Sequence, residues 1–377
     1  MDHKILVINS GSSSTKYKLL AMNPRKALLE GKVEVDQASG DTLAQVSERL
    51  RVAASQIAGI TAIGHRVVHG GGRLTGPAYL DQDALEAIAA LRRYAPLHTD
   101  AVLAGVRATA ELFPGVSQVG VFDTAFHATL PAHASAYALP REIAAKFDLR
   151  RFGFHGISCQ HALKVTAEAL GLPPTQCNLI VVHLGAGASV TAIEAGASVD
   201  TSMGLTPLEG LIMGTRCGDI DPAVPLFLQQ DLGMTAGEVY ELLNNESGLL
   251  GMCGAADMRE LHSLAASGHG PATLALEAFC YRVKKYIGAY CAVLGRVDAL
   301  VFTGGIGEND ARVRELVCEG LSSLGIELDG AKNTAPSNGM RPISTTGSPT
   351  KMFVVKADEE SEIAEQVLRF LGKERTA

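Results

Sequence analysis

Three glycine-containing segments of the chain have the residue types that hold phosphate groups. They are residues 9–16 (N-S-G-S-S-S-T-K), 183–189 (H-L-G-A-G-A-S) and 303–309 (T-G-G-I-G-E-N), and each follows a short apolar run. Glycine lets the backbone approach a phosphate closely, and successive N–H groups at such turns can donate to its oxygens. These segments predict a nucleotide and an anionic co-substrate held together, so phosphoryl transfer is the first chemistry to consider.

Spacing excludes the two commonest phosphate-binding motifs. A P-loop requires G-x-x-x-x-G-K-[ST], and the Gly-Lys pairs at residues 31–32 and 372–373 do not meet it. A dinucleotide fingerprint opens a helix, whereas residues 185–187 are followed by the alternating S-V-T-A-I that is typical of a strand. The first two segments are therefore predicted to be turns of β-hairpins, which gives the chain a weak internal repeat.

The elements that position these turns alternate between strands and helices. Apolar or alternating runs predict strands over residues 4–8, 17–20, 32–35, 61–68, 118–122, 179–184, 189–193, 298–303 and 352–355. Apolar residues at helical spacing predict helices around residues 84–91, 102–106, 313–321 and 363–370. This pattern predicts the α/β class, and the repeated hairpin predicts two similar domains facing a cleft.

Composition and charge narrow the classes of partner. The 377 residues are 47% hydrophobic and carry a formal net charge of -7, which disfavours nucleic acid because its binding needs a basic surface. No apolar run has the length of a signal peptide or of a membrane span. The seven cysteines form no C-x-x-C pair and are odd in number, as expected of reduced thiols. We therefore expect a cytoplasmic protein with small-molecule substrates and no membrane partner.

Motifs along nearly the whole chain resemble those of one enzyme family. They are residues 9–17 (N-S-G-S-S-S-T-K-Y), 64–71 (G-H-R-V-V-H-G-G), 95–98 (A-P-L-H), 122–127 (F-D-T-A-F-H), 152–156 (F-G-F-H-G), 202–210 (S-M-G-L-T-P-L-E-G), 213–222 (M-G-T-R-C-G-D-I-D-P), 303–309 (T-G-G-I-G-E-N) and 358–360 (D-E-E). In this order they resemble the acetate kinase family of short-chain acyl kinases, which belongs to the actin-like ATPase superfamily.

The resemblance implies a fold, a reaction and an assembly. The fold would have two similar actin-like (ribonuclease H-like) domains with a central catalytic cleft. Residues 1–125 and a C-terminal helix over residues 362–377 would form the first domain, and residues 126–361 the second, nucleotide-binding domain. The reaction would be reversible, direct in-line transfer from ATP to acetate, giving ADP and acetyl phosphate. The resemblance also implies Mg²⁺, with Mn²⁺ as an alternative ion, and a homodimer.

Phosphoryl transfer requires cations that neutralise the moving group. Arg66 and Arg216 are the candidates, because each lies in a glycine-flanked stretch with few other charges, where a guanidinium can bind phosphate or carboxylate. The alternative is a surface arginine in an ion pair. The resemblance implies that both arginines bracket the carboxylate and the phosphoryl group, with Asn9 near that group. It further implies that His155 donates a hydrogen bond there; the alternative is a structural core histidine.

Magnesium needs only one or two protein carboxylates, because it keeps several waters. The resemblance implies Asn9, Asp123 and Glu359 as the residues at the metal. Both acids follow predicted strands, where side chains of an α/β sheet gather at the carboxyl edge. Either acid could instead cap a helix, and Glu360 is an alternative to Glu359.

The remaining implied contacts divide between the acid and the nucleotide. The methyl end of the acid would lie among Val68, Leu97, Phe154 and Pro207. The nucleotide and its phosphates would contact Ser12, Ser14, Lys16, His183, Gly185, Gly187, Asp257, Arg259, Gly305, Ile306 and Asn309. One methylene changes binding by only about 1 to 3 kcal/mol, so a propionate or butyrate kinase stays open. A nucleotide-gated binding module is the alternative from a different class.

Two features depart from the family pattern. The second glycine turn usually has the sequence H-L-G-N-G, and Ala186 stands here in place of the asparagine. One side-chain amide that could reach the nucleotide phosphates is therefore missing, and we expect weaker nucleotide binding with activity retained. The stretch between Leu20 and Ile63 is also shorter than usual, which affects the edge of the first domain.

Overall fold

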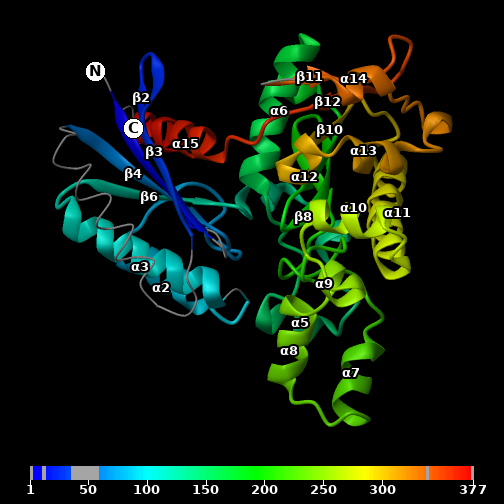
Figure 1. Ribbon diagram of the computed structural model, residues 1–377. Helices are drawn as coiled ribbons and strands as arrows, with labels where there is room; N and C mark the ends of the chain where they lie inside the picture. The colour runs from blue at the N-terminus through cyan, green and yellow to red at the C-terminus, as the bar shows by residue number, and fades with distance from the viewer. Residues whose placement is uncertain (1–2, 11–13, 35–58, 95, 337–338, 375–377) are drawn as a thin grey trace. The chain divides into compact units, whose positions relative to one another are not determined.

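The computed structural model describes residues 3–10, 14–34, 59–94, 96–336 and 339–374 (Figure 1). The chain divides into two compact units. The first comprises Met1–Ala128, Phe154–His161 and Asp358–Ala377, and the second comprises Thr129–Gly153 and Ala162–Ala357. Each unit contains its own six-stranded sheet.

The sheet of the first unit has the strand order β3-β2-β1-β4-β6-β5. Its strands are β1 (Lys4–Ser10), β2 (Ser14–Met22), β3 (Arg25–Glu34), β4 (Ile60–Val67), β5 (Ala78–Tyr79) and β6 (Ser117–Phe122). β1, β2 and β3 pair antiparallel, whereas β1, β4 and β6 pair parallel. The short β5 runs antiparallel to β6. Three parallel strands therefore end at the same edge of this sheet.

The sheet of the second unit repeats this arrangement in the order β11-β12-β10-β7-β8-β9. Its strands are β7 (Leu179–Leu184), β8 (Ala188–Glu194), β9 (Ala197–Thr201), β10 (Ala299–Thr303), β11 (Arg341–Pro342) and β12 (Lys351–Val354). β7, β8 and β9 pair antiparallel, β7, β10 and β12 pair parallel, and β11 runs antiparallel to β12. The α/β class and the repeated hairpin predicted from the sequence are thereby confirmed.

Alternating side chains give the first sheet two buried faces. On β1, Val7 belongs to a buried cluster that includes Val367 of α15 (Glu359–Glu374). The preceding residue, Leu6, belongs to a separate cluster that packs against the end of α3 (Pro96–Leu112). Successive strand residues point to opposite faces, so each face needs its own cover. In Figure 1 the blue strands accordingly lie between the cyan α3 and the red α15.

The other helices begin and end as follows. They are α2 (Gln82–Ala90), α4 (Ala132–Ser135), α5 (Arg141–Phe147), α6 (Gly156–Leu170), α7 (Ala223–Gln230), α8 (Ala236–Asn245), α9 (Gly248–Cys253), α10 (Met258–Ala266), α11 (Gly270–Leu294), α12 (Gly304–Asn309), α13 (Ala311–Cys318) and α14 (Gly330–Thr334), with short 3-10 helices at Ala125–Thr129, Pro174–Gln176 and Ser322–Leu324. The described ranges contain no helix that combines the length and the apolar character needed to cross a membrane.

Local sequence explains several of these boundaries. Thr235 and Glu238 form a capping box in which each side chain satisfies a backbone N–H of the other, so α8 begins there. Buried residues of α11 recur every three or four positions, and this stripe packs against β7 and β8. All six residues of β7 are buried, as expected for a central strand with both faces covered.

Candidate active site

Three parallel strands of the first unit end beside one another and carry Asn9, Arg66 and Asp123. Asn9 and Arg66 are the next-to-last residues of β1 and β4, and Asp123 follows β6 directly. In the register of the sheet, Arg66 pairs with Val121, two residues before Asp123. The carboxyl ends of adjacent parallel strands meet at one edge, and that edge brings the three side chains together.

Arg66 lies at the centre of this group. Its Nε and Nη2 atoms donate to Asp123 Oδ2 at 3.0 and 2.6 Å, and its Nη1 atom donates to Asn9 Oδ1 at 3.2 Å. Nη1 also lies 3.7 Å from Glu359 Oε2 in an ion pair of two side chains that are each 14% exposed. The guanidinium is therefore fixed by acids and an amide of its own unit, in a mostly buried setting.

The first turn of α15 supplies the two glutamates of the cluster. Asn9 Nδ2 donates to Glu359 Oε2 at 3.1 Å and to Glu360 Oε1 at 2.8 Å. Lys16 Nζ lies 4.0 Å from Glu360 Oε1. Both glutamates thus reach Asn9, but Glu359 is the one that also forms an ion pair with Arg66. We call Asn9, Arg66, Asp123, Glu359 and Glu360 the acidic cluster.

Burial and charge shift the protonation of this cluster. Burial raises the pKa of the Asp123 carboxyl to about 6; Arg66 partly opposes this shift and Glu359 adds to it. Burial alone lowers the pKa of Arg66, but the charges of Asp123 and Glu359 outweigh it and hold that pKa above its usual value. Three carboxylates therefore face two cations, Arg66 and Lys16. An additional cation would be electrostatically favourable here.

One oxygen of Asp123 is left for a ligand. Asp123 Oδ1 is buried and has no hydrogen-bond partner among the residues that the structure describes, whereas Oδ2 binds Arg66. A buried acceptor without a partner costs free energy that a ligand can recover. This oxygen, with Glu359 beside it, fits Mg²⁺, which takes one or two carboxylates and keeps waters. The described residues include no group of three or more His, Cys, Asp or Glu that could enclose a metal.

The segment that precedes α6 lies against the backbone of Asp123. Gly156 N donates to Asp123 O at 3.0 Å, and a Cβ at Gly156 would lie 2.2 Å from that oxygen. Only glycine permits this approach. The preceding residue, His155, has a φ of 59°, in the left-handed region that residues other than glycine rarely adopt. Such strained backbone is concentrated at functional sites because the surrounding structure must enforce it.

The residues predicted for the methyl pocket divide between the units. Val68 and Phe154 belong to the first unit and are 6% and 1% exposed. Phe154 O lies 2.9 Å from the Nε2 atom of His127, whose pKa is lowered to about 4 by burial. Pro207 belongs to the second unit. Ser12 and the side chains of Ser14 and Leu97 lie outside the described residues.

The second unit brings its two glycine segments together. β7 and β10 pair in parallel with His183 opposite Thr303, so both strands end at one edge. A Cβ at Gly185 would lie 3.8 Å from His183 Nε2 and 4.0 Å from Gly305 N. The turn formed by residues 185–187 and the start of α12 are therefore neighbours, as a shared phosphate site requires.

A third segment approaches the same turn. A Cβ at Gly214 would lie 3.3 Å from Ala256 O and 3.9 Å from Ala186 O. Asp257 follows Ala256 and is the N-cap of α10. Its carboxylate accepts from Arg259 N at 2.8 Å and from Arg259 Nη2 at 2.8 Å. The Arg259 side chain is 92% exposed. Asp257 therefore has a helix-capping role in this structure, and Arg259 is accessible to a ligand.

Residues 303–309 are predicted from the sequence as a glycine turn between a strand and a helix, but residues 304–309 form the short helix α12 instead. The side chain of Asn309 donates to Gly305 O at 2.8 Å within this helix. Arg314 is not predicted as a functional or structural residue from the sequence. It is fully buried and donates from Nη1 to Gly307 O at 2.8 Å and to Glu308 O at 3.0 Å. These bonds satisfy carbonyls at the end of α12. The available signal was an arginine next to the apolar residues of a predicted helix.

Arg216 of the second unit is held without an acid. Its Nη1 atom donates to Pro207 O at 3.3 Å and lies 3.7 Å from Met213 Sδ. No carboxylate pairs with it in the part of the chain that the structure describes, and burial lowers the pKa of its guanidinium. A largely buried cation without a counter-ion is suited to an anionic ligand.

Comparisons with known proteins found similar sequences and structures over nearly the whole chain. The model of the acetokinase family matches residues 33–365. A protein of Lawsonia intracellularis named acetate kinase is 44% identical, over 98% of this chain and 99% of its own length. The crystal structure of Porphyromonas gingivalis acetate kinase is similar with a TM-score of 0.89 and 39% identity, covering 98% of this chain and 100% of that one.

A third relative has a different name. The crystal structure of a propionate kinase from Francisella tularensis also reaches a TM-score of 0.89, with 40% identity over 97% of this chain and 98% of that one. These structural matches, with the two sheets of equal topology, confirm the predicted actin-like fold of two similar domains.

Proposed function

The chain belongs to the acetokinase family, and we propose that it catalyses reversible phosphoryl transfer from ATP to acetate, giving ADP and acetyl phosphate. The observation that carries the proposal is the acidic cluster, because it combines a fixed guanidinium with a free carboxylate oxygen. Transfer of a phosphoryl group asks for alignment and charge neutralisation more than for covalent chemistry. No protein nucleophile is needed for direct in-line transfer.

The proposed cations are Arg66 and Arg216. They would bind the acetate carboxylate and neutralise charge on the moving phosphoryl group, with a hydrogen bond from His155. Asn9 would orient this group, since its amide already bonds Arg66 and both glutamates. Preorganised donors of this kind stabilise the transition state because they need no rearrangement during the reaction.

Asp123 and Glu359 are the proposed metal residues, with Asn9 beside them. Mg²⁺ bound there would offset charge on the nucleotide phosphates; Mn²⁺ is the alternative ion. Asp123 would contribute Oδ1, because Oδ2 is held by Arg66. Arg66 would thereby fix the orientation of the carboxylate that binds the ion.

The other proposed contacts are to the acid and to the nucleotide, and each of these two sets draws residues from both units. Val68, Leu97, Phe154 and Pro207 would surround the methyl group of acetate. The nucleotide would contact a second, larger set of residues: Ser12, Ser14, Lys16, His183, Gly185, Gly187, Asp257, Arg259, Gly305, Ile306 and Asn309. The proximity of the turn formed by residues 185–187 to Gly305 and of Ala186 to Gly214 supports this group.

A hydroxylamine trap tests the proposed reaction directly. Purified protein with ATP, Mg²⁺ and acetate is expected to form acetyl phosphate, which hydroxylamine converts to a coloured hydroxamate. The same mixture without acetate is the control. If no hydroxamate forms above this control while nucleotide still binds, the chain is a nucleotide-binding module and the proposal fails.

Propionate is the second candidate substrate, because the propionate kinase of Francisella tularensis matches this chain as well as an acetate kinase does. One added methylene is worth only about 1 to 3 kcal/mol, so the preference is a matter of degree. The ratio of kcat/KM for acetate, propionate and butyrate decides between them. A ratio that favours propionate over acetate would reassign the substrate.

We also propose a homodimer in the cytoplasm, with one domain of residues 1–125 plus 362–377 and a second domain of residues 126–361. The compact units differ from these bounds mainly in that Phe154–His161 belongs to the first unit. All seven cysteines are free thiols, which supports a reducing compartment. Light scattering of the purified protein tests the oligomeric state, and a mass equal to one chain would reject the dimer.

A further inference from the structure

The loop that carries Pro207 and leads to Arg216 is anchored by three side chains that the proposed reaction does not use. They are Tyr137, Arg151 and Glu209, all of the second unit. The loop begins after β9, and residues 202–222 contain no helix or strand. Without internal backbone ladders, its shape must be fixed by side chains and by the backbone around it.

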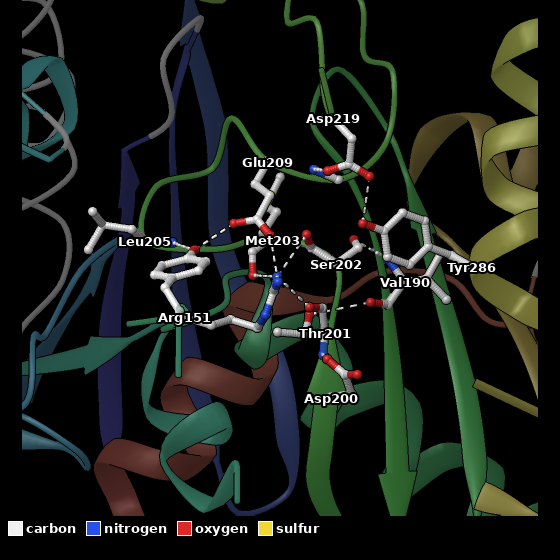
Figure 2. Close-up of polar contacts among 12 residues, drawn as sticks. Arg151, Val190, Asp200, Thr201, Ser202, Met203, Leu205, Glu209, Asp219 and Tyr286 are labelled. Carbon is white, nitrogen blue, oxygen red and sulfur yellow. Dashed lines mark hydrogen bonds and ion pairs between the residues drawn. The ribbon is translucent and has the colours of Figure 1, made fainter. Parts of the chain in front are cut away.

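Arg151 binds the start of the loop. Its Nη1 atom donates to the carbonyls of Thr201 at 2.9 Å, Ser202 at 3.1 Å and Met203 at 3.0 Å. Its Nη2 atom donates to Glu209 Oε1 at 2.5 Å. Figure 2 shows the guanidinium between these carbonyls and the carboxylate. One planar cation therefore joins the beginning of the loop to a residue six positions further on.

Glu209 closes the loop from its other oxygen. Tyr137 Oη donates to Glu209 Oε2 at 2.5 Å and accepts from Leu205 N at 2.8 Å. Burial and the charge of Glu209 raise the pKa of Tyr137, so its hydroxyl keeps the proton that it donates. Met203, Leu205 and Glu209 are thus fixed to one another through two side chains that lie far from them in the sequence.

Gly204 gives an independent sign that this arrangement is built into the chain. A Cβ at this residue would lie 1.7 Å from Glu209 Oε2 and 2.2 Å from Tyr137 Oη. Any side chain would therefore push into the bond between the carboxylate and the hydroxyl. The Gly204 carbonyl accepts from Phe152 N at 3.1 Å, which ties the residue after Arg151 to the same loop.

The far end of the loop has a second anchor. Gly210 N donates to Asp219 Oδ1 at 2.8 Å, and Asp219 Oδ2 accepts from Tyr286 Oη at 2.8 Å (Figure 2). Between the two anchors lies Pro207, whose carbonyl accepts from Arg216 Nη1 at 3.3 Å. In the described part of the chain no acid pairs with Arg216, so the hydrogen bond to the Pro207 carbonyl orients its guanidinium.

We propose that Tyr137, Arg151 and Glu209 are positioning residues that fix the loop of residues 203–210 and, through the Pro207 carbonyl, aim Arg216 at the anionic substrate. This inference rests on the proposed function, because it assigns Arg216 to the reaction. A displacement of about 1 Å in a catalytic group costs on the order of 100-fold in rate, so loosening the loop should be visible in turnover.

Four substitutions test the positioning role. Glu209→Gln keeps the shape and removes the charge, Tyr137→Phe removes the hydroxyl, Gly204→Ala forces the two apart, and Arg151→Lys keeps the charge but loses the fork that reaches three carbonyls. Each is expected to lower kcat for acetate phosphorylation by about 10- to 100-fold. The Kd for ATP should stay within about twofold, because none of the proposed nucleotide contacts lies in residues 203–210.

The matched controls carry the same chemical changes at ion pairs that do not involve Tyr137, Arg151 or Glu209. Glu315→Gln breaks an ion pair with Arg312, and both of these side chains are 59% exposed. Arg150→Lys changes the residue before Arg151; Arg150 pairs with Asp148 at 3.0 Å. Both should retain wild-type kcat and KM. If Glu209→Gln and Tyr137→Phe also retain them, or if Arg151→Lys behaves like wild type, the positioning role is rejected.

Hydrogen exchange of the backbone separates this inference from the proposed function. Leu205 N–H donates to Tyr137, so Tyr137→Phe should speed exchange in the peptide that contains residues 203–210 and leave peptides of β10 unchanged. Unchanged exchange in that peptide overturns the inference even in an active kinase. If wild-type protein forms no acetyl phosphate, the proposed function fails, and the link from the loop to catalysis fails with it. A general fall in melting temperature with kcat and ATP affinity reduced together would show a merely structural role and overturn the inference.

Discussion

The two arginines proposed to act on the phosphoryl group are held in opposite ways. Arg66 in the first unit donates twice to Asp123 and also faces Glu359, and these acids raise its pKa. Arg216 in the second unit donates to a carbonyl, and burial lowers its pKa. Both residues follow from the same sequence pattern of glycine-flanked arginines.

The difference shows how one residue type serves two purposes. The charge of Arg66 is already compensated, so this residue can orient Asp123 and hold the acidic cluster before any ligand binds. The charge of Arg216 is not compensated within the described residues, so an anionic substrate would gain the full benefit of it. Removing the two arginines should therefore affect stability differently although both substitutions reduce activity.

The largest effect is expected for Arg216→Ala. Loss of a cation that neutralises the phosphoryl group lowers turnover by about 10³- to 10⁵-fold. The melting temperature should stay the same or rise, because the residue has no ion pair in the described structure to lose. The hydroxamate assay and a thermal melt measure both quantities. Arg312→Ala, at an exposed pair, is the control; wild-type turnover in Arg216→Ala would remove this residue from the reaction.

Arg66→Ala should combine loss of turnover with loss of stability. It leaves the Asp123 carboxylate, which is 1% exposed, without its cation, and breaking a buried pair on one side costs about 3 to 5 kcal/mol of unfolding free energy. The double variant Arg66→Ala/Asp123→Asn should recover much of the stability and none of the activity. Urea unfolding measures the difference. A single variant as stable as Arg216→Ala would refute the contrast between the two arginines.

The raised pKa of Asp123 makes stability depend on pH in the absence of metal. Because the folded state raises the pKa of this carboxyl from 3.8 to about 6, the folded protein binds the proton more tightly than the unfolded chain does. Its contribution is therefore favourable below about pH 4 and is lost as the pH rises through about 6. Asp123→Asn cannot ionise, so its unfolding free energy relative to wild type should increase over this range. A constant difference between the two proteins would contradict the shifted pKa.

The smallest effect concerns the glycine turn of the second unit. Ala186→Asn restores an amide that could bond a nucleotide phosphate, and one hydrogen bond is worth about 0.5 to 1.5 kcal/mol. The KM for ATP should fall about 2- to 10-fold, while the KM for acetate serves as the internal control. If the nucleotide KM does not change, the backbone of this turn already provides the contacts that matter.

Strands with strong local patterns were predictable. The run L-I-V-V-H-L predicts a strand over residues 179–184, and β7 has these bounds, because a central strand is apolar on both faces. The short β5 and β11 and the more polar β9 are not predicted. These strands form because they pair with the edge of a sheet, and that edge exists only in the folded protein.

Much of the acidic cluster was predictable from the sequence. The resemblance implies Asn9, Asp123 and Glu359, Arg66 lies in a glycine-flanked stretch, and Asp123 directly follows a strand, where parallel strands end together. Three features were not predictable from the sequence: the Asp123 oxygen without a partner, the counter-ions of Arg66, and the anchoring of the loop that leads to Arg216. Tyr137, Arg151 and Glu209 bind partners 50 to 72 positions away, and several of these are backbone carbonyls.

Sequence alone determined which elements form and which residue types lie at their ends, because both depend on neighbours along the chain. The tertiary structure decided which charges are compensated, because that depends on groups that only the fold brings within hydrogen-bond distance.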